Sequence, residues 1–233
     1  MSSNPLIIVI GAYGSGKSEY SINLAKKLYE TEDTNVSLVD LDVVNPFFRS
    51  RFMRDRFEKI GIEVIAPEFQ YGHADLPMIS PRIRGAIQDY SKTVILDVGG
   101  DPAGCRALGR FVDDINNRGY TMHFVINTKR PFTSNLQDII EMKNMLEFSS
   151  KLKITEVICN TNLMQLTDVE LVQEGIEIIN EVAIKENLLF STFLVMETDE
   201  IIYPNDINNK QKMKLEYFLK KPWDKNTQGN SFC

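Results

Sequence analysis

The chain has 233 residues, of which 43% are hydrophobic, 25% are charged and 9% are aromatic. This is the composition of a globular protein and excludes an intrinsically disordered chain. With 26 Lys and Arg against 32 Asp and Glu, the net charge is −6. That balance argues against broad binding to nucleic acid or to anionic membranes, so we expect no nucleic-acid partner.

Short β-branched runs alternate with longer amphipathic stretches along the chain. The sequence predicts strands at 6–10, 36–40, 63–66, 93–98, 121–126, 156–160 and 189–195, and helices at 18–29, 47–59, 82–90, 103–117, 135–148, 169–186 and 208–219. A proline-containing segment, 67–81, is irregular and long enough to be a functional loop. This alternation predicts an α/β fold with a mostly parallel sheet of about seven strands and helices on both faces.

The distribution of cysteines and apolar runs indicates the compartment. Cys105, Cys159 and Cys233 are far apart and odd in number, so they form no disulfide framework and no CxxC metal motif. The first residues lack the charged region of a secretory signal, and the apolar runs are too short to cross a bilayer. We therefore expect a cytoplasmic protein without a transmembrane segment, with one domain at 1–223 and a polar tail at 224–233.

The most specific motif runs from Gly11 to Ser18 and matches GxxxxGK[ST], between a predicted strand and a predicted helix. Glycines allow backbone N–H groups to surround phosphates, and the helix N-terminus adds its dipole. The Lys17 ammonium reaches the β and γ phosphates, and the Ser18 hydroxyl ligates Mg²⁺. The motif predicts a P-loop NTPase sandwich of three layers, with nucleotide contacts from Gly11, Tyr13, Gly14, Ser15, Gly16, Lys17, Ser18 and Glu19.

Two acidic strand ends complete this pattern. Asp97 closes an apolar strand, as in a Walker B motif where the carboxylate holds Mg²⁺ through water. Gly100 follows in an Asp-x-x-Gly sequence that resembles the second switch of GTPase-like folds, where the glycine N–H senses the γ-phosphate. Asp42 follows the second strand, where it could position the attacking water or bind the metal. The alternatives are a helix cap for Asp97 and a turn, Asn45-Pro46, around Asp42.

These motifs, in this order, resemble the SIMIBI class of P-loop nucleotidases, including the MinD/ParA/CobQ-like ATPases and the nitrogenase iron protein. The resemblance covers residues 6–195. It implies ATP and Mg²⁺ as cofactors, catalysis by Lys17, Asp42 and Asp97, metal binding by Ser18, Asp42 and Asp97, and dimerisation across the nucleotide face. Ala12 stands where MinD/ParA proteins have a signature lysine that reaches into the partner's site, so that contribution is missing.

Later residues are candidates to contact the base of the nucleotide and a second anionic ligand. The stretch Asn160-Thr-Asn-Leu163 lacks the lysine and aspartate of a guanine-reading motif, so the resemblance favours adenine, with Asn160 as the base contact and Pro204 packing on the ring. The stretch Thr128-Lys-Arg-Pro131 follows another strand and is a candidate to face a ligand or partner. Several arginines lie near the predicted nucleotide edge, among them Arg49, Arg82, Arg84 and Arg106. Each is either an anion contact or part of a solvated face. A buried thiol is the simpler interpretation of Cys105, ahead of a metal ligand.

Together these features predict an Mg²⁺-dependent ATPase that acts as a switch on an unidentified protein partner, such as a metalloenzyme or an assembly. An ATP-dependent homodimer is expected. A small-molecule kinase is the first alternative, with 67–81 as the acceptor loop and Arg82 and Arg84 as the anion clamp. A nucleotide-sensing adaptor with slow hydrolysis is the second.

Overall fold

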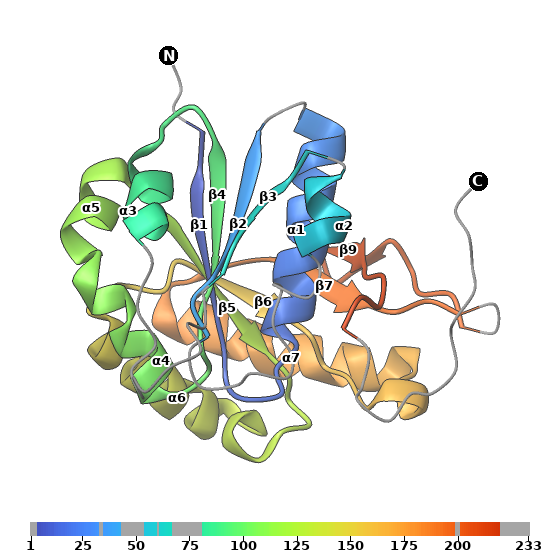
Figure 1. Cartoon of the computed structure of the whole chain (residues 1–233). Coiled ribbons are helices and arrows are strands. Elements are labelled where there is room, and N and C mark those ends of the chain that lie inside the picture. The colour runs from blue at the N-terminus through green and yellow to red at the C-terminus, as the bar shows by residue number, and fades with distance from the viewer. Residues whose placement is uncertain are drawn as a thin grey trace, which may run out of the picture.

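A computed structural model of the chain describes residues 4–32, 35–42, 54–59, 61–66, 81–198 and 201–219. Its strands are β1 (Leu6–Ile10), β2 (Val36–Asp40), β3 (Glu63–Ile65), β4 (Thr93–Asp97), β5 (Thr121–Ile126), β6 (Glu156–Cys159), β7 (Leu189–Val195), β8 (Asp206–Ile207) and β9 (Lys210–Lys214). They form one sheet in the order β3-β2-β4-β1-β5-β6-β7-β9-β8 (Figure 1). All neighbours are parallel except β8 and β9. The α/β sheet is confirmed, with nine strands where about seven were expected.

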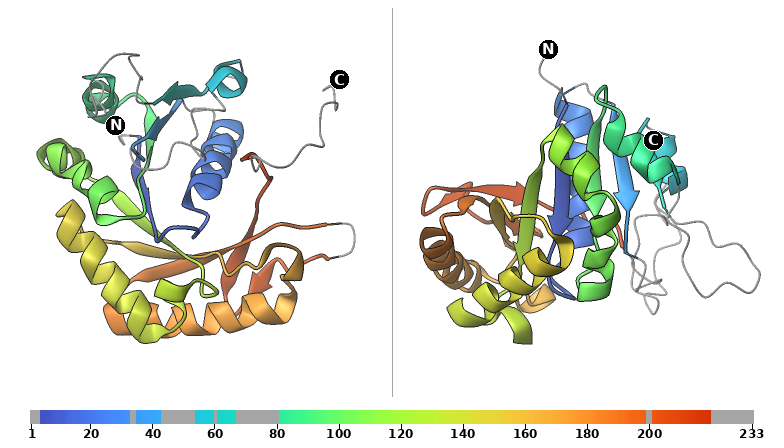
Figure 2. Two further views of the ribbon diagram at one scale, coloured as in Figure 1. Left: turned by 60° about the horizontal axis from the view of Figure 1, so that its bottom comes forward. Right: turned by 90° about the vertical axis from the view of Figure 1, so that its left-hand side faces the viewer.

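Helices cover both faces of this sheet. They are α1 (Lys17–Glu32), α2 (Arg54–Glu58), α3 (Pro81–Gln88), α4 (Pro102–Arg106), α5 (Val112–Arg118), α6 (Leu136–Ser150) and α7 (Val169–Glu186). Along β1, Ile7 and Val9 pack in the cluster with α1 and α2, whereas Ile8 and Ile10 pack in the cluster with α3, α5, α6 and α7. Figure 2 shows α1 lying within the curve of the twisted sheet. Strands β1, β2 and β4 are buried throughout, as parallel strands between two helical layers must be.

Two predicted helices are wrong in type or extent. Residues 208–219 do not form a closing helix, because Asn208 and Asn209 have φ values of 52° and 61° and turn the chain into the β8–β9 hairpin. Asn tolerates this left-handed conformation, which two-residue hairpin turns require. Residues 103–117 are split into α4, a 3₁₀ turn at Leu108–Arg110 and α5. Gly109 lies at the interruption, where its low helix propensity favours a break.

Other predictions end in residues that are not described. Of the arginine-rich helix at 47–59, the structure describes α2, and residues 67–80 of the predicted loop and the 224–233 tail lie outside the described ranges. None of the described helices is long and apolar enough to cross a membrane.

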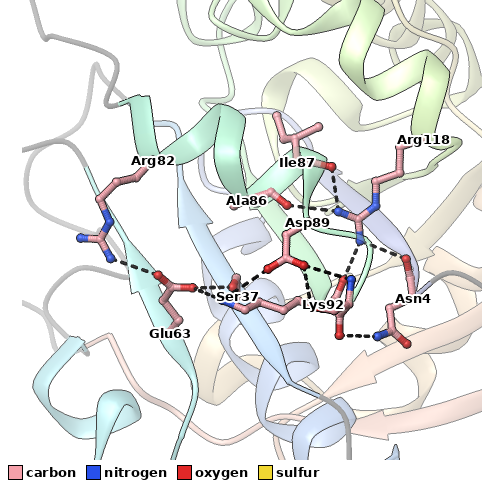
Figure 3. Close-up of polar contacts among 10 residues, drawn as sticks. Asn4, Ser37, Glu63, Arg82, Ala86, Ile87, Asp89, Lys92 and Arg118 are labelled. Atoms are coloured by element: carbon pink, nitrogen blue, oxygen red, sulfur yellow. Dashed lines mark hydrogen bonds and ion pairs between the residues drawn. The ribbon is translucent and has the colours of Figure 1, made fainter.

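The amino ends of the central strands are held by a polar network (Figure 3). The buried Arg118 guanidinium donates to the carbonyls of Ala86, Ile87, Asn4 and Lys92, at 3.1, 2.8, 3.0 and 2.6 Å. Two of these acceptors close the C-terminal end of α3, where helix carbonyls lack internal partners. This end of the sheet is therefore occupied by structural contacts, and the candidate site lies at the opposite, carboxyl end.

Candidate functional site

Residues 11–16, called the phosphate loop here after their predicted role, connect β1 to α1 at the carboxyl edge of the sheet. Gly14 and Gly16 have φ values of +74° and +85°, which side chains other than glycine rarely adopt. The amide of Tyr20 donates to Gly16 O at 3.0 Å and starts the helix directly behind the loop. Lys17 is buried at the helix N-terminus, whereas Tyr13 is 72% exposed on the outside of the loop. The loop has the positive-φ glycines and the strand-to-helix context that the sequence predicted.

The acid after β2 meets the lysine of this loop. Lys17 Nζ lies 3.8 Å from Asp42 Oδ2, and both side chains are largely buried. The amide of Asp42 donates to Asp40 Oδ1 at 3.0 Å, which fixes the chain as it leaves β2. Asp40 in turn is the register partner of Asp97 in β4. Strand pairing therefore brings the acidic ends of β2 and β4 together beside Lys17.

Asp97, like Asp40, is almost completely buried. Ser21 Oγ donates to its Oδ1 at 3.2 Å, and its Oδ2 is buried without a hydrogen-bond partner among the described residues. Burial raises the pKa of Asp97 to about 6, although the Lys17 charge and the Ser18 hydroxyl oppose the shift. A carboxylate oxygen left bare beside a serine hydroxyl fits a divalent cation. No cluster of three or more His, Cys, Asp or Glu in the described ranges could hold a metal alone, so a nucleotide would have to supply further ligands.

The segment after β4 lies directly against the phosphate loop. A Cβ atom added to Gly100 would stand 2.6 Å from Gly11 O and 2.9 Å from Tyr13 N. One added to Gly99 would stand 3.2 Å from Asp42 Oδ1. Only glycine permits such close approach, so a shift of the loop would displace this segment and α4 behind it.

Asn160, the predicted base contact, lies on the other side of the loop. Its Nδ2 donates to Ser15 O at 2.6 Å, and the side chain is 6% exposed. A Cβ on Gly16 would stand 2.2 Å from the same nitrogen. Asn160 thus supports the loop whether or not it contacts a base. Pro204 is exposed in the connection from β7 to β8, and its role in base binding stays a prediction.

The Glu19 side chain bonds the backbone near the end of the described chain. Its carboxylate accepts from the backbone amides of Phe218 and Leu219, and burial raises its pKa to about 7. One turn further along α1, Asn23 forms a reciprocal pair with the backbone of Glu216, at 2.9 and 2.8 Å. The Glu19 side chain therefore anchors the C-terminal segment to α1, and a nucleotide contact from Glu19 stays a prediction.

The loops after β5 and β6 contain further functional candidates, of which the sequence singled out only the stretch 128–131, without a role for any one of its residues. Arg130 Nε donates to Gly14 O at 3.2 Å. Asn127 bonds the backbone of Asn162 twice, at 2.9 and 3.2 Å, and the Thr128 and Thr161 hydroxyls are 2.9 Å apart. The sequence contained the information needed to find these residues, because polar residues that follow two predicted parallel strands must meet at the carboxyl edge of the sheet. Choosing among them needed the strand order.

Several candidate residues are engaged elsewhere. Arg82 bonds Glu63 at the start of β3, and Arg84 pairs with Asp114, so neither supports the predicted anion clamp. Arg49 lies outside the described residues, and Arg106 is exposed in α4. Cys105 is fully buried, its Sγ lies 3.5 Å from Gly99 O, and burial raises its pKa to about 12. An unreactive buried thiol fits these observations.

Comparison with known proteins identifies the fold. No protein-family model and no curated protein matches the sequence. Among solved structures, cell division protein FtsY of Thermotoga maritima has a TM-score of 0.55 at 20% identity, covering 87% of this chain and 65% of that one. Chloroplast FtsY of Physcomitrella patens has 0.57 at 16%, with coverages of 88% and 63%. FtsY of Mycoplasma mycoides has 0.54 at 12%, with 84% and 61%.

The present chain thus spans less than two thirds of the length of each of these structures. At this level of identity, the likeness establishes architecture and does not distinguish a MinD/ParA-like branch. The chain has the fold of these FtsY structures.

Proposed function

We propose that this protein binds and hydrolyses ATP with Mg²⁺ and acts as a nucleotide-driven switch on a protein partner. The observation that carries the proposal is the convergence of Lys17, Asp42 and Asp97 at a glycine loop with Gly100 packed against it. A buried lysine beside two carboxylates, at a helix N-terminus, suits a bound triphosphate and its metal.

Each residue has a defined part in this reaction. The Lys17 ammonium and the loop N–H groups bind the β and γ phosphates and stabilise charge on the transferred group. The Ser18 hydroxyl and the bare Asp97 carboxylate oxygen hold Mg²⁺, which neutralises phosphate charge when bound. Asp42 accepts a hydrogen bond from the attacking water and orients it in line with the γ-phosphate.

Adenine is the base that the site supports best. The Nδ2 group of Asn160 donates to Ser15 O, which holds the side chain in place, and its Oδ1 atom remains as an acceptor for a base. An acceptor pairs with the 6-amino group of adenine and repels the 6-oxo group of guanine. Titration calorimetry with ATP and GTP tests this point: tighter binding of ATP is expected, and equal or tighter binding of GTP overturns it.

A homodimer closed by ATP across the carboxyl edge is the conformational change that we propose. Exposed apolar side chains at this edge, Tyr13 at 72% and Phe132 at 70%, support a face that becomes covered. Light scattering on Asp42→Ala, which should bind ATP without hydrolysing it, is the test. A dimer with Mg-ATP and a monomer without it is expected, and a monomer at saturating Mg-ATP contradicts the proposal.

Hydrolysis itself is tested by phosphate release from ATP in the presence and absence of Mg²⁺. Release that requires Mg²⁺ and no added acceptor supports the proposal. Turnover only with a small acceptor would identify a kinase instead, and tight binding without turnover would identify a nucleotide sensor.

A further inference from the structure

The phosphate loop divides the carboxyl edge of the sheet into two sides. Strands β4 and β2 lie on one side of β1, with Asp97 and Asp42 at their ends, and β5 and β6 lie on the other. If the proposed function holds, on which this inference rests, the metal and the terminal phosphate lie by the acids. A nucleotide that starts there must extend its nucleoside across the loop, toward the ends of β5 and β6.

A cationic side chain, Arg130, contacts the loop on this nucleoside side. Arg130 is half-buried, and its Nε donates to Gly14 O at 3.2 Å. A Cβ atom on Gly14 would stand 3.3 Å from Nε and 3.7 Å from Cζ, so the guanidinium lies close over the exposed turn of the loop. No other polar partner of this guanidinium is found in the described part of the chain. By contrast, the neighbouring Lys129 is paired with Glu174 at 3.0 Å.

The backbone that carries Arg130 is firmly held. Its amide donates to Asn127 O at 3.2 Å, its carbonyl accepts from Thr133 N at 3.1 Å, and Thr133 Oγ1 donates to Asn127 O at 2.7 Å. Asn127 in turn is bonded to the β6 loop through Asn162. Arg130 and Asn160 are thus presented by two cross-linked loops and contact adjacent carbonyls of the phosphate loop. Such preorganisation lowers the entropic cost of binding.

We propose that Arg130 is a nucleoside-positioning residue whose guanidinium stacks on the purine ring while Asn160 contacts the edge of the base. The bond from Nε lies in the guanidinium plane, so it leaves a flat face of the group free to meet an aromatic ring. Arginine stacks on aromatic faces through this face and its charge. Stacking does not distinguish adenine from guanine, so Arg130 adds affinity for both, and the choice between them belongs to Asn160.

The test compares Arg130→Ala, Arg130→Lys and the control Lys129→Ala by calorimetry with ATP, ADP, GTP and inorganic tripolyphosphate. For Arg130→Ala we expect ATP, ADP and GTP each to bind about 3- to 30-fold more weakly, with an unchanged ATP-to-GTP ratio and unchanged tripolyphosphate affinity. Arg130→Lys should recover little of this loss, because an ammonium lacks the flat face. Lys129→Ala should bind all four ligands as the parent chain does.

Three results would overturn the assignment in distinct ways. Loss of ATP affinity with ADP unchanged would place the guanidinium on the γ-phosphate. Loss of tripolyphosphate affinity as well would mean that Arg130 only shapes the loop, and unchanged nucleotide affinity would mean that it has no contact. If the parent chain binds neither ATP nor ADP, the proposed function itself fails; if it binds both and Arg130→Ala binds them equally well, the Arg130 assignment alone fails. Thermal melts of each variant establish that it is folded.

Discussion

The two sides of the phosphate loop are built from opposite kinds of groups. On the β2 and β4 side, Asp42 and Asp97 face Lys17 from buried positions, and glycines let the chain touch the loop. On the β5 and β6 side, Arg130 and Asn160 donate hydrogen bonds to loop carbonyls. Under the proposed function, the first side supplies the charges for phosphate chemistry, and the second holds the loop and presents groups suited to a nucleoside. Chemistry and recognition are therefore separable by mutation.

The largest expected effect is the loss of phosphate release when Lys17, the cation beside the two acids, is removed. Lys17→Ala removes the cation at the phosphates and should lower phosphate release by about 10²- to 10³-fold or more, because a preorganised charge acts directly on the transferred group. Lys27→Ala, on an exposed position of the same helix, is the control and should retain turnover. Similar turnover in Lys17→Ala and the parent chain would refute the assignment of the loop.

The free energy of unfolding should depend on pH through His123, a buried histidine of β5 that packs against α1. His123 Nδ1 lies 2.9 Å from the Tyr20 hydroxyl, and its Nε2 lies 3.5 Å from Glu156 Oε2. Burial lowers the pKa of His123 from 6.5 to about 4. The unfolded chain therefore binds a proton below pH 6.5 that the folded chain refuses until about pH 4, so the free energy of unfolding should fall by up to about 3 kcal/mol across that window.

Glu156 opposes this trend, since burial raises its pKa, whereas Tyr20, whose pKa is also raised, stays neutral throughout. The contribution of His123 is isolated as the difference between urea unfolding of the parent chain and of His123→Gln at several pH values. This difference should change steadily between about pH 6.5 and pH 4. A constant difference would show that the imidazole is not buried in its neutral form.

The segment after β4 packs closely against the phosphate loop, and two glycine-to-alanine variants, one inside this contact and one outside it, test its importance. Gly100→Ala places a methyl group 2.6 Å from Gly11 O, so the loop must shift at a cost of about 1–3 kcal/mol. Nucleotide affinity should fall about tenfold. At Gly109, nothing lies within 4 Å of an added Cβ, and Gly109→Ala should leave affinity unchanged. Calorimetry with ADP measures both, and equal affinities would mean that Gly100 does not abut the loop.

The smallest effect concerns the choice of base. Asn160→Ala removes the bond to Ser15 O and the Oδ1 acceptor, so the preference for ATP over GTP should shrink by about tenfold. Thr155→Ala, on an exposed position before β6, is a suitable control for the ratio. An unchanged ratio in Asn160→Ala would assign base reading to another residue.

The functional residues on the acidic side of the loop could be predicted from the sequence more fully than those on the other side, for a physical reason. Lys17, Asp97 and Gly100 lie in short continuous motifs whose local spacing already encodes their geometry. Arg130 and Asn127 carry no motif, and they reach the loop because β5 is the neighbour of β1 in the sheet. The hairpin at the end of the chain was missed because the left-handed turn of Asn208 and Asn209 was not weighed against a helical pattern.

The anchorage of the C-terminal segment has a practical consequence for shortened chains. Glu19 directly follows Ser18, and its buried carboxylate is matched by the amides of Phe218 and Leu219. A chain cut after Lys214 would lose both donors and also the Phe218 ring, which packs 5.8 Å from that of Phe57. It would leave an uncompensated acid next to the predicted metal ligand. Removing the segment that follows β9 would therefore disturb the first turn of α1, where the phosphates are expected to bind, although the two are far apart in sequence.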